Sequence, residues 1–187
     1  MNNTGKLRMS WDFARRLVGI AFIALAAMSA AAQPTQNSTD AQREAMNKLA
    51  FLAGKWSGPV SIYRGAGEAL RLTQHEDVEF KLDGLVLLIE GKSMGSDGKA
   101  QFEALATIAY DDASHRYRIR AYHDGHYLDA PLTVFADGFS WGFTSGPAKI
   151  ENTMHLTAKH EWQETTEVTV GDRPAQRSVE MFLTHKP

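Results

Sequence analysis

The chain has 187 residues, of which 43% are hydrophobic, 10% aromatic and 22% charged, with a formal net charge of −2 and no cysteine. Such a composition fits one globular domain that can bury a core, and it excludes disordered and fibrous classes. The lack of cysteine excludes a disulfide framework, a thiolate metal site and an iron–sulfur cluster. The nearly balanced charge argues against a nucleic-acid partner.

The first 32 residues have the pattern of an export signal. Four basic residues precede an apolar run over 17–28, and Ala30-Ala31-Ala32 fits a cleavage site before Gln33. The run has about 12 residues, whereas about 20 are needed to span a bilayer. We therefore expect a cleaved signal peptide at 1–32, no stable membrane insertion after cleavage, and a periplasmic or secreted protein. An uncleaved anchor is the alternative.

A polar tether at 33–38 is followed by the pattern of a short helix. Thr39 or Asp40 can cap this helix, and apolar residues recur with helical spacing as far as Leu52. Gly54 is expected to end it.

Beyond Trp56 the chain is punctuated by Asp-Gly dipeptides, which favour tight hairpin turns. They begin at positions 83, 97, 124 and 137, and a turn-like cluster at 111–114 divides the longest interval, so reversals recur about every 13 or 14 residues. This spacing leaves no room for crossover helices, so neighbouring strands must pair antiparallel.

The turns predict an all-β fold with about ten strands. An open sheet of this size would expose two long edge strands with unpaired backbone groups, which favour aggregation. Closure of the sheet into a barrel pairs these two strands with each other. We therefore expect one up-and-down antiparallel barrel with a short N-terminal helix, forming a single domain over 39–187; a β-sandwich is the alternative. The expected strands are 56–63, 69–81, 85–94, 101–110, 115–123, 126–135, 139–144, 149–158, 161–170 and 176–185.

Alternating side chains indicate which faces are buried. Phe139, Trp141 and Phe143 share one face of their strand. The strand at 85–94 is apolar on both faces, which predicts a cover on its outer side, either a packed helix or the interface of a homodimer. Small residues expected on inner faces, namely Ala104, Ala106 and Gly142, would leave the barrel lumen partly open.

The chain resembles the calycin superfamily of lipocalin-like barrels. The resemblance rests on the segment 51–58, which contains the motif Gly54-Lys55-Trp56 ahead of a series of hairpins. Tyr117-Arg118-Ile119-Arg120-Ala121-Tyr122, 138–142 and 180–184 extend the likeness to small exported calycin-like domains of unknown function, distantly similar to nitrobindin-type haem barrels. The resemblance implies a tryptophan that closes one barrel end, and it supplies no catalytic residues.

A ligand in the lumen would need polar groups to orient it. Arg118 and Arg120 share a face with Arg116 and Tyr122, and three neighbouring guanidinium groups require acids or an anionic ligand. One interpretation places this face at the barrel mouth; the other places it outside, in salt bridges with acids on neighbouring hairpins such as Glu90, Glu103 and Asp129. The candidate ligand-binding residues are Trp56, Arg118, Arg120, Tyr122, Ser140 and Trp141.

Ser140 lies in Gly138-Phe139-Ser140-Trp141-Gly142, which matches the nucleophile elbow of hydrolases. That motif needs a sharp turn from a strand into a helix. Here the alternation of aromatic residues continues through Ser140, so we expect a strand and no catalytic residue. A hydrolase, or another enzyme on a calycin scaffold, remains an alternative.

Three histidines are weak candidates for metal or haem. His123 and His126 flank an Asp-Gly turn as an opposed pair, but a catalytic zinc site normally takes three protein ligands. His155 lies in the region that supplies the haem ligand in nitrobindin-type barrels, yet it shares a face with polar residues and is expected to point to solvent. We therefore expect no cofactor and no metal, with haem or metal binding as the alternative.

These patterns predict an exported, non-enzymatic barrel that binds a small apolar or amphipathic molecule in its lumen. Its partner would be that small molecule.

Overall fold

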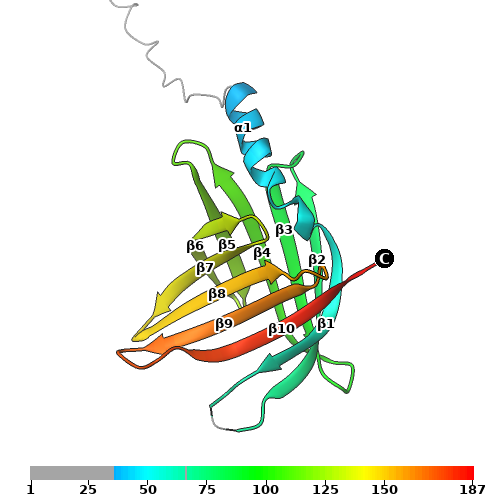
Figure 1. The fold of residues 1–187 in the computed structure, drawn as a ribbon, viewed down its shortest axis with the longest axis vertical. Coiled ribbons are helices and arrows are strands. Elements are labelled where there is room, and N and C mark those ends of the chain that lie inside the picture. Colours follow the sequence, from blue (N-terminus) through cyan, green and yellow to red (C-terminus); the bar gives the residue numbers. More distant parts are fainter. Residues whose placement is uncertain (1–35, 66) are drawn as a thin grey trace, which may run out of the picture. The chain divides into compact units, whose positions relative to one another are not determined.

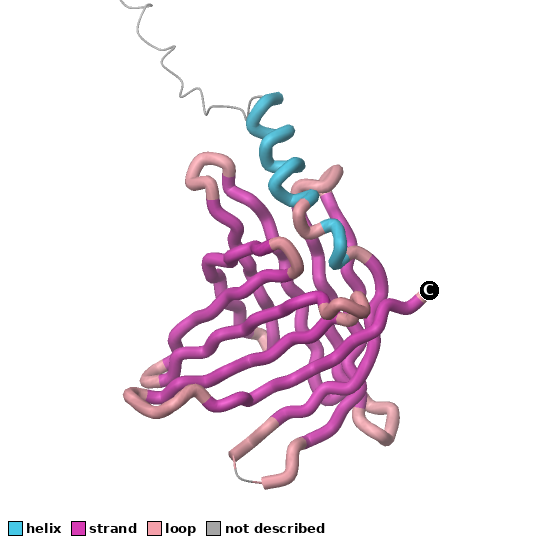
Figure 2. The backbone as a smooth tube through the Cα atoms, in the orientation of Figure 1, coloured by secondary structure: helices cyan, strands magenta, loops and turns pink. Residues whose placement is uncertain are grey.

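Ten antiparallel strands close into one barrel in the computed structural model, which describes residues 36–65 and 67–187 (Figures 1 and 2). Each strand pairs with its neighbours in the chain, and β1 also pairs with β10, which closes the barrel. The strands are β1 (Gly54–Ile62), β2 (Leu70–Lys81), β3 (Val86–Met94), β4 (Ala100–Asp111), β5 (Arg116–His123), β6 (His126–Phe135), β7 (Gly138–Ser145), β8 (Ala148–Leu156), β9 (Trp162–Val170) and β10 (Gln176–Lys186).

This architecture confirms the predicted up-and-down barrel, and the alternative of a β-sandwich is wrong. Each strand begins and ends within about two residues of its predicted position. The turn between β5 and β6 shows why the Asp-Gly signal works: Asp124 and Gly125 have φ of 48° and 74°, the left-handed pair that a two-residue hairpin turn requires.

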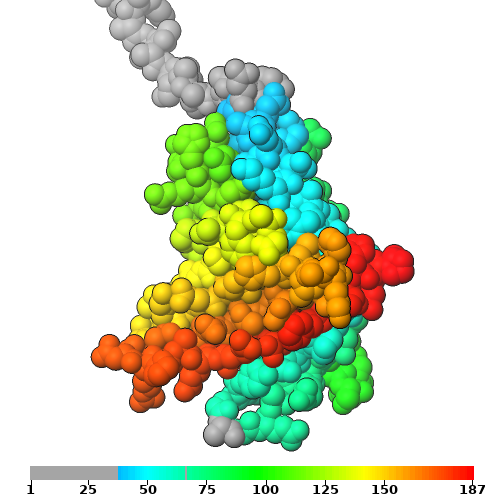
Figure 3. All heavy atoms as spheres, in the orientation of Figure 1, coloured from blue at the N-terminus to red at the C-terminus, as the bar shows by residue number. Residues whose placement is uncertain are grey.

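A short helix lies at one end of the barrel. Helix α1 spans Gln36–Asn47, and the 3-10 turn η2 spans Ala50–Leu52. The Tyr117 hydroxyl donates to the carbonyl of Ala45 (2.7 Å), and Arg43 pairs with Asp83 in the turn between β2 and β3 (2.9 Å). In Figure 3 the helix packs directly on this end of the strands. No helix in the described part of the chain is long and apolar enough to cross a membrane.

The predicted helix boundaries are wrong. Thr39 and Asp40 lie within α1 and not at its N-terminus. Gly54 does not end the helix but begins β1 with φ of 124°, and a Cβ there would lie 2.2 Å from the His185 ring. This glycine is therefore needed for the entry of the chain into the barrel wall, where β1 meets β10.

The helix end of the barrel is filled by apolar side chains. Met46, Leu49 and Leu52 are fully buried, and they belong to one core cluster with side chains from the ends of the strands beneath them, including Leu87, Ile108, Met154 and Leu183. Close packing of this kind stabilises the fold and leaves no room for a ligand at this end.

The opposite end contains a seam between β6 and β7. These strands pair only over Leu132–Phe135 and Gly138–Trp141, whereas β5 and β6 pair over Tyr117–His123 and His126–Leu132. In the described structure, residues 126–131 pair with β5 but not with β7, and residues 142–145 pair with β8 but not with β6. Pro131 lies where the pairing stops, and proline has no N–H to donate to a ladder.

Candidate functional site

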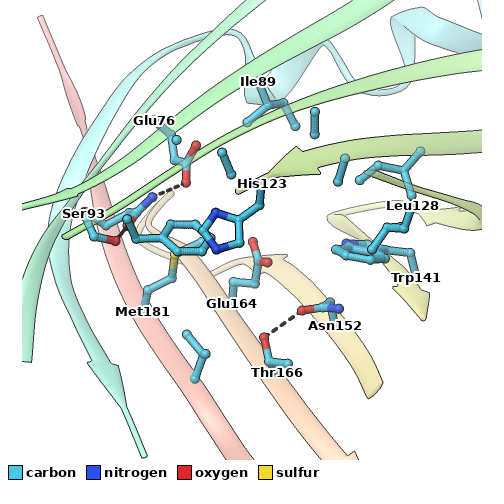
Figure 4. Close-up of a pocket in the computed structure, with 18 of the residues that line it drawn as sticks. Glu76, Ile89, Ser93, His123, Leu128, Trp141, Asn152, Glu164, Thr166 and Met181 are labelled. Carbon is cyan, nitrogen blue, oxygen red and sulfur yellow. Dashed lines mark hydrogen bonds between the residues drawn. The ribbon is translucent and has the colours of Figure 1, made fainter. Parts of the chain in front are cut away.

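A cavity of about 620 Å³ occupies the end of the lumen away from the helix. Its wall on β3, β4 and β5 includes four small residues, which leave space open: Gly91, Ala104, Ala106 and Ala121. Apolar side chains form most of the remaining wall (Figure 4): Val60, Ile62, Ile89, Ile119, Leu128, Phe139, Trp141, Phe143, Ile150, Val179 and Met181.

The prediction that Ala104 and Ala106 face inward is confirmed, but the same prediction for Gly142 is wrong. Gly142 does not line the cavity, and a Cβ on it would meet the carbonyl oxygen of Ile150 on β8 at 2.6 Å. Glycine at this position therefore permits close approach of two strands and adds no volume to the lumen.

The β5–β6 hairpin forms part of the cavity wall near the mouth. His123 and His126 are directly opposed across the hairpin, as their spacing predicts, and both line the cavity. The His123 ring lies against Phe102 with centroids 4.0 Å apart, and its Nδ1 is 2.9 Å from the carbonyl oxygen of Glu103. Among the described residues no group of three or more His, Asp or Glu side chains could hold a metal ion.

A chain of polar contacts on β2 and β3 places a carboxyl group in the cavity wall. The Ser93 hydroxyl donates to the Gln74 side-chain carbonyl, and Gln74 Nε2 donates to Glu76 Oε1 (2.7 Å). Gly91 makes space for this carboxyl, because a Cβ there would lie 2.8 Å from Glu76 Oε2. Burial away from water raises the pKa of Glu76 from 4.5 to about 8, and the charge of Glu164 adds to that rise.

A second carboxyl group, that of Glu164 on β9, also lines the cavity. Trp162 Nε1 donates to Glu164 Oε2 (3.0 Å), which orients the group. The residue is half-buried and lines the cavity. Desolvation raises its pKa from 4.5 to about 7. A separate polar pair, Thr166 and Asn152, is joined by a hydrogen bond of 2.7 Å and completes the polar part of the lining.

Sequence reasoning missed both glutamates. Gln74 and Glu76 occupy the same face of β2 as the buried residues Leu72 and Val78. A polar residue at an inward position of an alternating strand is the signal that could have identified them. This signal was hard to recognise in the sequence, because the outer face of β2 also carries polar residues and the strand does not show a clear alternation.

Of the predicted ligand-binding residues, Trp141 presents its ring to the lumen (Figure 4). Tyr122 borders the cavity at its mouth, but its ring packs against Tyr127 (centroids 5.9 Å apart) on the face that carries Arg120, and 41% of its surface is exposed. Trp56 is buried and does not line this cavity; its Nε1 donates to the carbonyl of Leu52 (2.8 Å), and its ring packs edge-on against Trp162. It thus packs beneath the 3-10 turn η2, on the side of the barrel that the helix covers.

Three other predicted ligand residues lie on the outer face of the barrel. Arg118 and Arg120 do not line the cavity, and both guanidinium groups pair with Asp129 on β6, so the interpretation with salt bridges on the outer face is the one the structure supports. Ser140 pairs with Thr133 and Thr153 in the middle of β7. It also does not line the cavity, and the continuous strand contradicts a nucleophile elbow.

His155 likewise lies outside the cavity lining. Its ring packs against Phe135 with centroids 4.6 Å apart, and its Nδ1 is 3.4 Å from Asp137 Oδ2. The expected solvent-facing orientation is confirmed: half of this side chain is exposed.

Comparisons with known proteins support the barrel fold and go no further. No protein-family model matches the chain, and no curated protein matches it. Among solved structures, the crystal structure of Rv2717c from M. tuberculosis is similar, with a TM-score of 0.58 and 10% sequence identity, over 76% of this chain and 98% of that one. At this identity the likeness shows a shared fold alone.

Proposed function

We propose that this protein is an exported, calycin-like barrel that binds a small amphipathic molecule in its lumen without catalysing a reaction. The observation that carries the proposal is the contrast between the two ends of the barrel, one filled and one hollow. A cavity of about 620 Å³ falls within the range of small-molecule sites. Its largely apolar wall with a few enclosed polar groups is the lining typical of such sites.

The seam between β6 and β7 supports a route into this cavity. Leu128 on β6 and Trp141 and Phe143 on β7 line the cavity, and they flank the region in which the two strands are unpaired. A ligand can pass between strands there without breaking a continuous ladder of backbone hydrogen bonds.

The non-enzymatic role is proposed because the one nucleophile motif of the sequence lies in a strand on the outer face. Export is proposed from the N-terminal pattern, which falls outside the described residues. N-terminal sequencing of the secreted protein is expected to find Gln33 as the first residue; a mature chain that retains residues 1–32 would contradict export by cleavage.

Binding in the lumen can be tested with a neutral apolar dye, N-phenyl-1-naphthylamine. We expect saturable binding at one site per chain, with a rise and blue shift of dye fluorescence as the ring leaves water. Ala106→Phe fills the hollow and should abolish the signal. Ala109→Phe is the matched control. Ala109 lies three residues from Ala106 on β4, so its side chain is on the opposite face of the strand, and it does not line the cavity.

Circular dichroism shows whether each variant folds. If Ala106→Phe fails to fold, Ala121→Phe fills the same hollow from β5. Dye binding that survives both substitutions in folded protein would overturn the proposal of a luminal site.

A further inference from the structure

Glu76 is a buried acid whose hydrogen bonds are incomplete. Its side chain belongs to the cavity lining, and the residue is only 8% exposed. Oε1 accepts from Gln74, but Oε2 has no hydrogen-bond partner in the described structure. Figure 4 shows the carboxyl group pointing into the space between the strands. A buried polar atom without a partner is costly, so this oxygen is poised to bind a group that the ligand supplies.

Glu164 adds a second acid to the same space. Glu164 lines the same cavity as Glu76, and Figure 4 shows both side chains in this space. The charge of Glu164 contributes to the raised pKa of Glu76. No lysine or arginine occurs among the described residues that line the cavity. The ionisable groups of the lining are Glu76 on β2, Tyr122 and His123 on β5, His126 and Tyr127 on β6, and Glu164 on β9.

This charge distribution selects against anionic ligands. A carboxylate or phosphate in the lumen would meet two acids and no permanent cation, which repels it when the acids are ionised. A divalent metal ion is a poor fit as well, because the described residues offer no group of three ligating side chains. An organic cation with an apolar body matches both the acids and the aromatic wall.

We propose that the luminal ligand is an amphipathic amine whose ammonium group binds between Glu76 and Glu164 while its apolar part packs in the hollow. This inference rests on the proposed luminal binding function. An ammonium group has three N–H donors, and one of them can satisfy Glu76 Oε2. Trp141 lies across the lumen and offers an aromatic face to the apolar part.

The hydrogen bonds around both acids hold them ready for a cation. Ser93 fixes the Gln74 amide so that its NH2 group faces Glu76, and the indole of Trp162 holds Glu164. Each donor stabilises the ionised carboxylate, so pairing with an ammonium group requires little rearrangement.

Proton release is a distinctive consequence of this proposal. Without ligand, the raised pKa of Glu76, about 8, keeps this carboxyl mostly protonated at pH 6.5. The bound ammonium ion favours the carboxylate, so the Glu76 proton passes to the buffer while the amine keeps its own proton. A neutral ligand causes no such release.

The test compares decylamine, decanol and decanoic acid, which share one chain length and differ in the head group, by isothermal titration calorimetry at pH 6.5. We expect decylamine to bind at least about tenfold more tightly than decanol. In a second series at pH 8.5, where both acids are mostly ionised, we expect decanoic acid to bind most weakly. Titrations in buffers of different ionisation enthalpy should show release of protons from Glu76 and Glu164, up to two per decylamine bound, and none for decanol.

Glu76→Gln should weaken decylamine binding about tenfold or more and remove the Glu76 part of the proton release, while decanol binding stays nearly unchanged. Gly91→Ala tests the same group without removing it, because the new Cβ displaces the carboxyl from its cradle. This substitution should also weaken the binding of decylamine more than the binding of decanol. Glu79→Gln is the matched control, since Glu79 lies on the same strand, is exposed and does not line the cavity.

The outcomes separate this inference from the luminal function. If decanol and decylamine bind equally well and no proton is released, the amine proposal is wrong while luminal binding stands. If none of the three compounds binds to folded protein, luminal binding of amphipathic molecules fails and the amine proposal fails with it. Selective binding of decanoic acid would overturn the amine proposal alone.

Discussion

At the scale of single residues, the most unusual feature of the barrel is an acid kept away from water without a charged partner. Gln74 supplies one hydrogen bond to Glu76, which favours ionisation, but burial outweighs it and the pKa rises. The folded protein therefore holds the proton that the unfolded chain releases above about pH 4.5. Folding and proton uptake are thus linked at this site.

Because the folded protein takes up a proton at Glu76, we expect its stability to fall as pH rises. Between pH 4.5 and about 8 the folded state binds more protons at Glu76 than the unfolded state does, so the free energy of unfolding decreases as pH increases. From pH 5 to pH 7 the loss attributable to Glu76 is between about 2 and 3 kcal/mol, because one pKa unit corresponds to about 1.4 kcal/mol.

Urea unfolding of Glu76→Gln across this pH range should show a clearly smaller decrease than unfolding of the native protein. Glu79→Gln should retain the full decrease. Parallel curves for the native protein and Glu76→Gln would contradict the raised pKa.

The residue scale also shows where sequence patterns stop being informative. Alternation correctly assigned Trp141 to the lumen, because an aromatic residue signals a buried face. It could not decide the side on which Arg118 and Arg120 lie, because the sequence does not show that Asp129 stands beside both. The luminal acids were missed for the opposite reason: glutamate in a strand is usually on the outer face.

At the scale of elements, α1 and η2 act as a plug for one barrel end. Leu49 has no exposed surface and packs in the core cluster together with Met46 and Leu52. Leu49→Ala should lower the free energy of unfolding by about 2–5 kcal/mol, through lost apolar burial and the cavity left behind.

Chemical denaturation measures this loss, and Lys48→Ala, at an exposed neighbouring position, should change stability little. Because the plug and the hollow lie at opposite ends, Leu49→Ala should leave dye affinity nearly unchanged in protein that remains folded. A substitution at Leu49 as harmless as the one at Lys48 would show that the helix does not stabilise the barrel.

Strands were more predictable than the helix because turn residues fix strand ends directly. Asp124 and Gly125 specify a left-handed turn whatever surrounds them. The start of α1 has no comparable marker: Thr39 and Asp40 are good caps, yet the helix begins before them. The role of Gly54 depends on His185, which is distant in sequence and reaches it only when β10 closes against β1.

At the scale of the whole molecule, closure is complete except for the seam between β6 and β7. Amides of 126–131 and 142–145 that point into the seam lack strand acceptors in the described structure. They should exchange with solvent faster than the paired amides of Leu132–Phe135, because exchange requires no opening of a ladder. Hydrogen exchange followed by NMR resolves these positions; equal protection on both sides of Pro131 would contradict an open seam.

The separation of a packed end from a hollow end has a consequence for how this protein can diversify. Substitutions at Ala104 on β4 and Ala121 on β5, which line the hollow and lie outside the core cluster, alter the shape of the hollow without touching the side chains beneath the helix. Such a chain can acquire new binding preferences by single steps while its thermal tolerance stays nearly constant, a freedom that uniformly packed barrels of similar size lack.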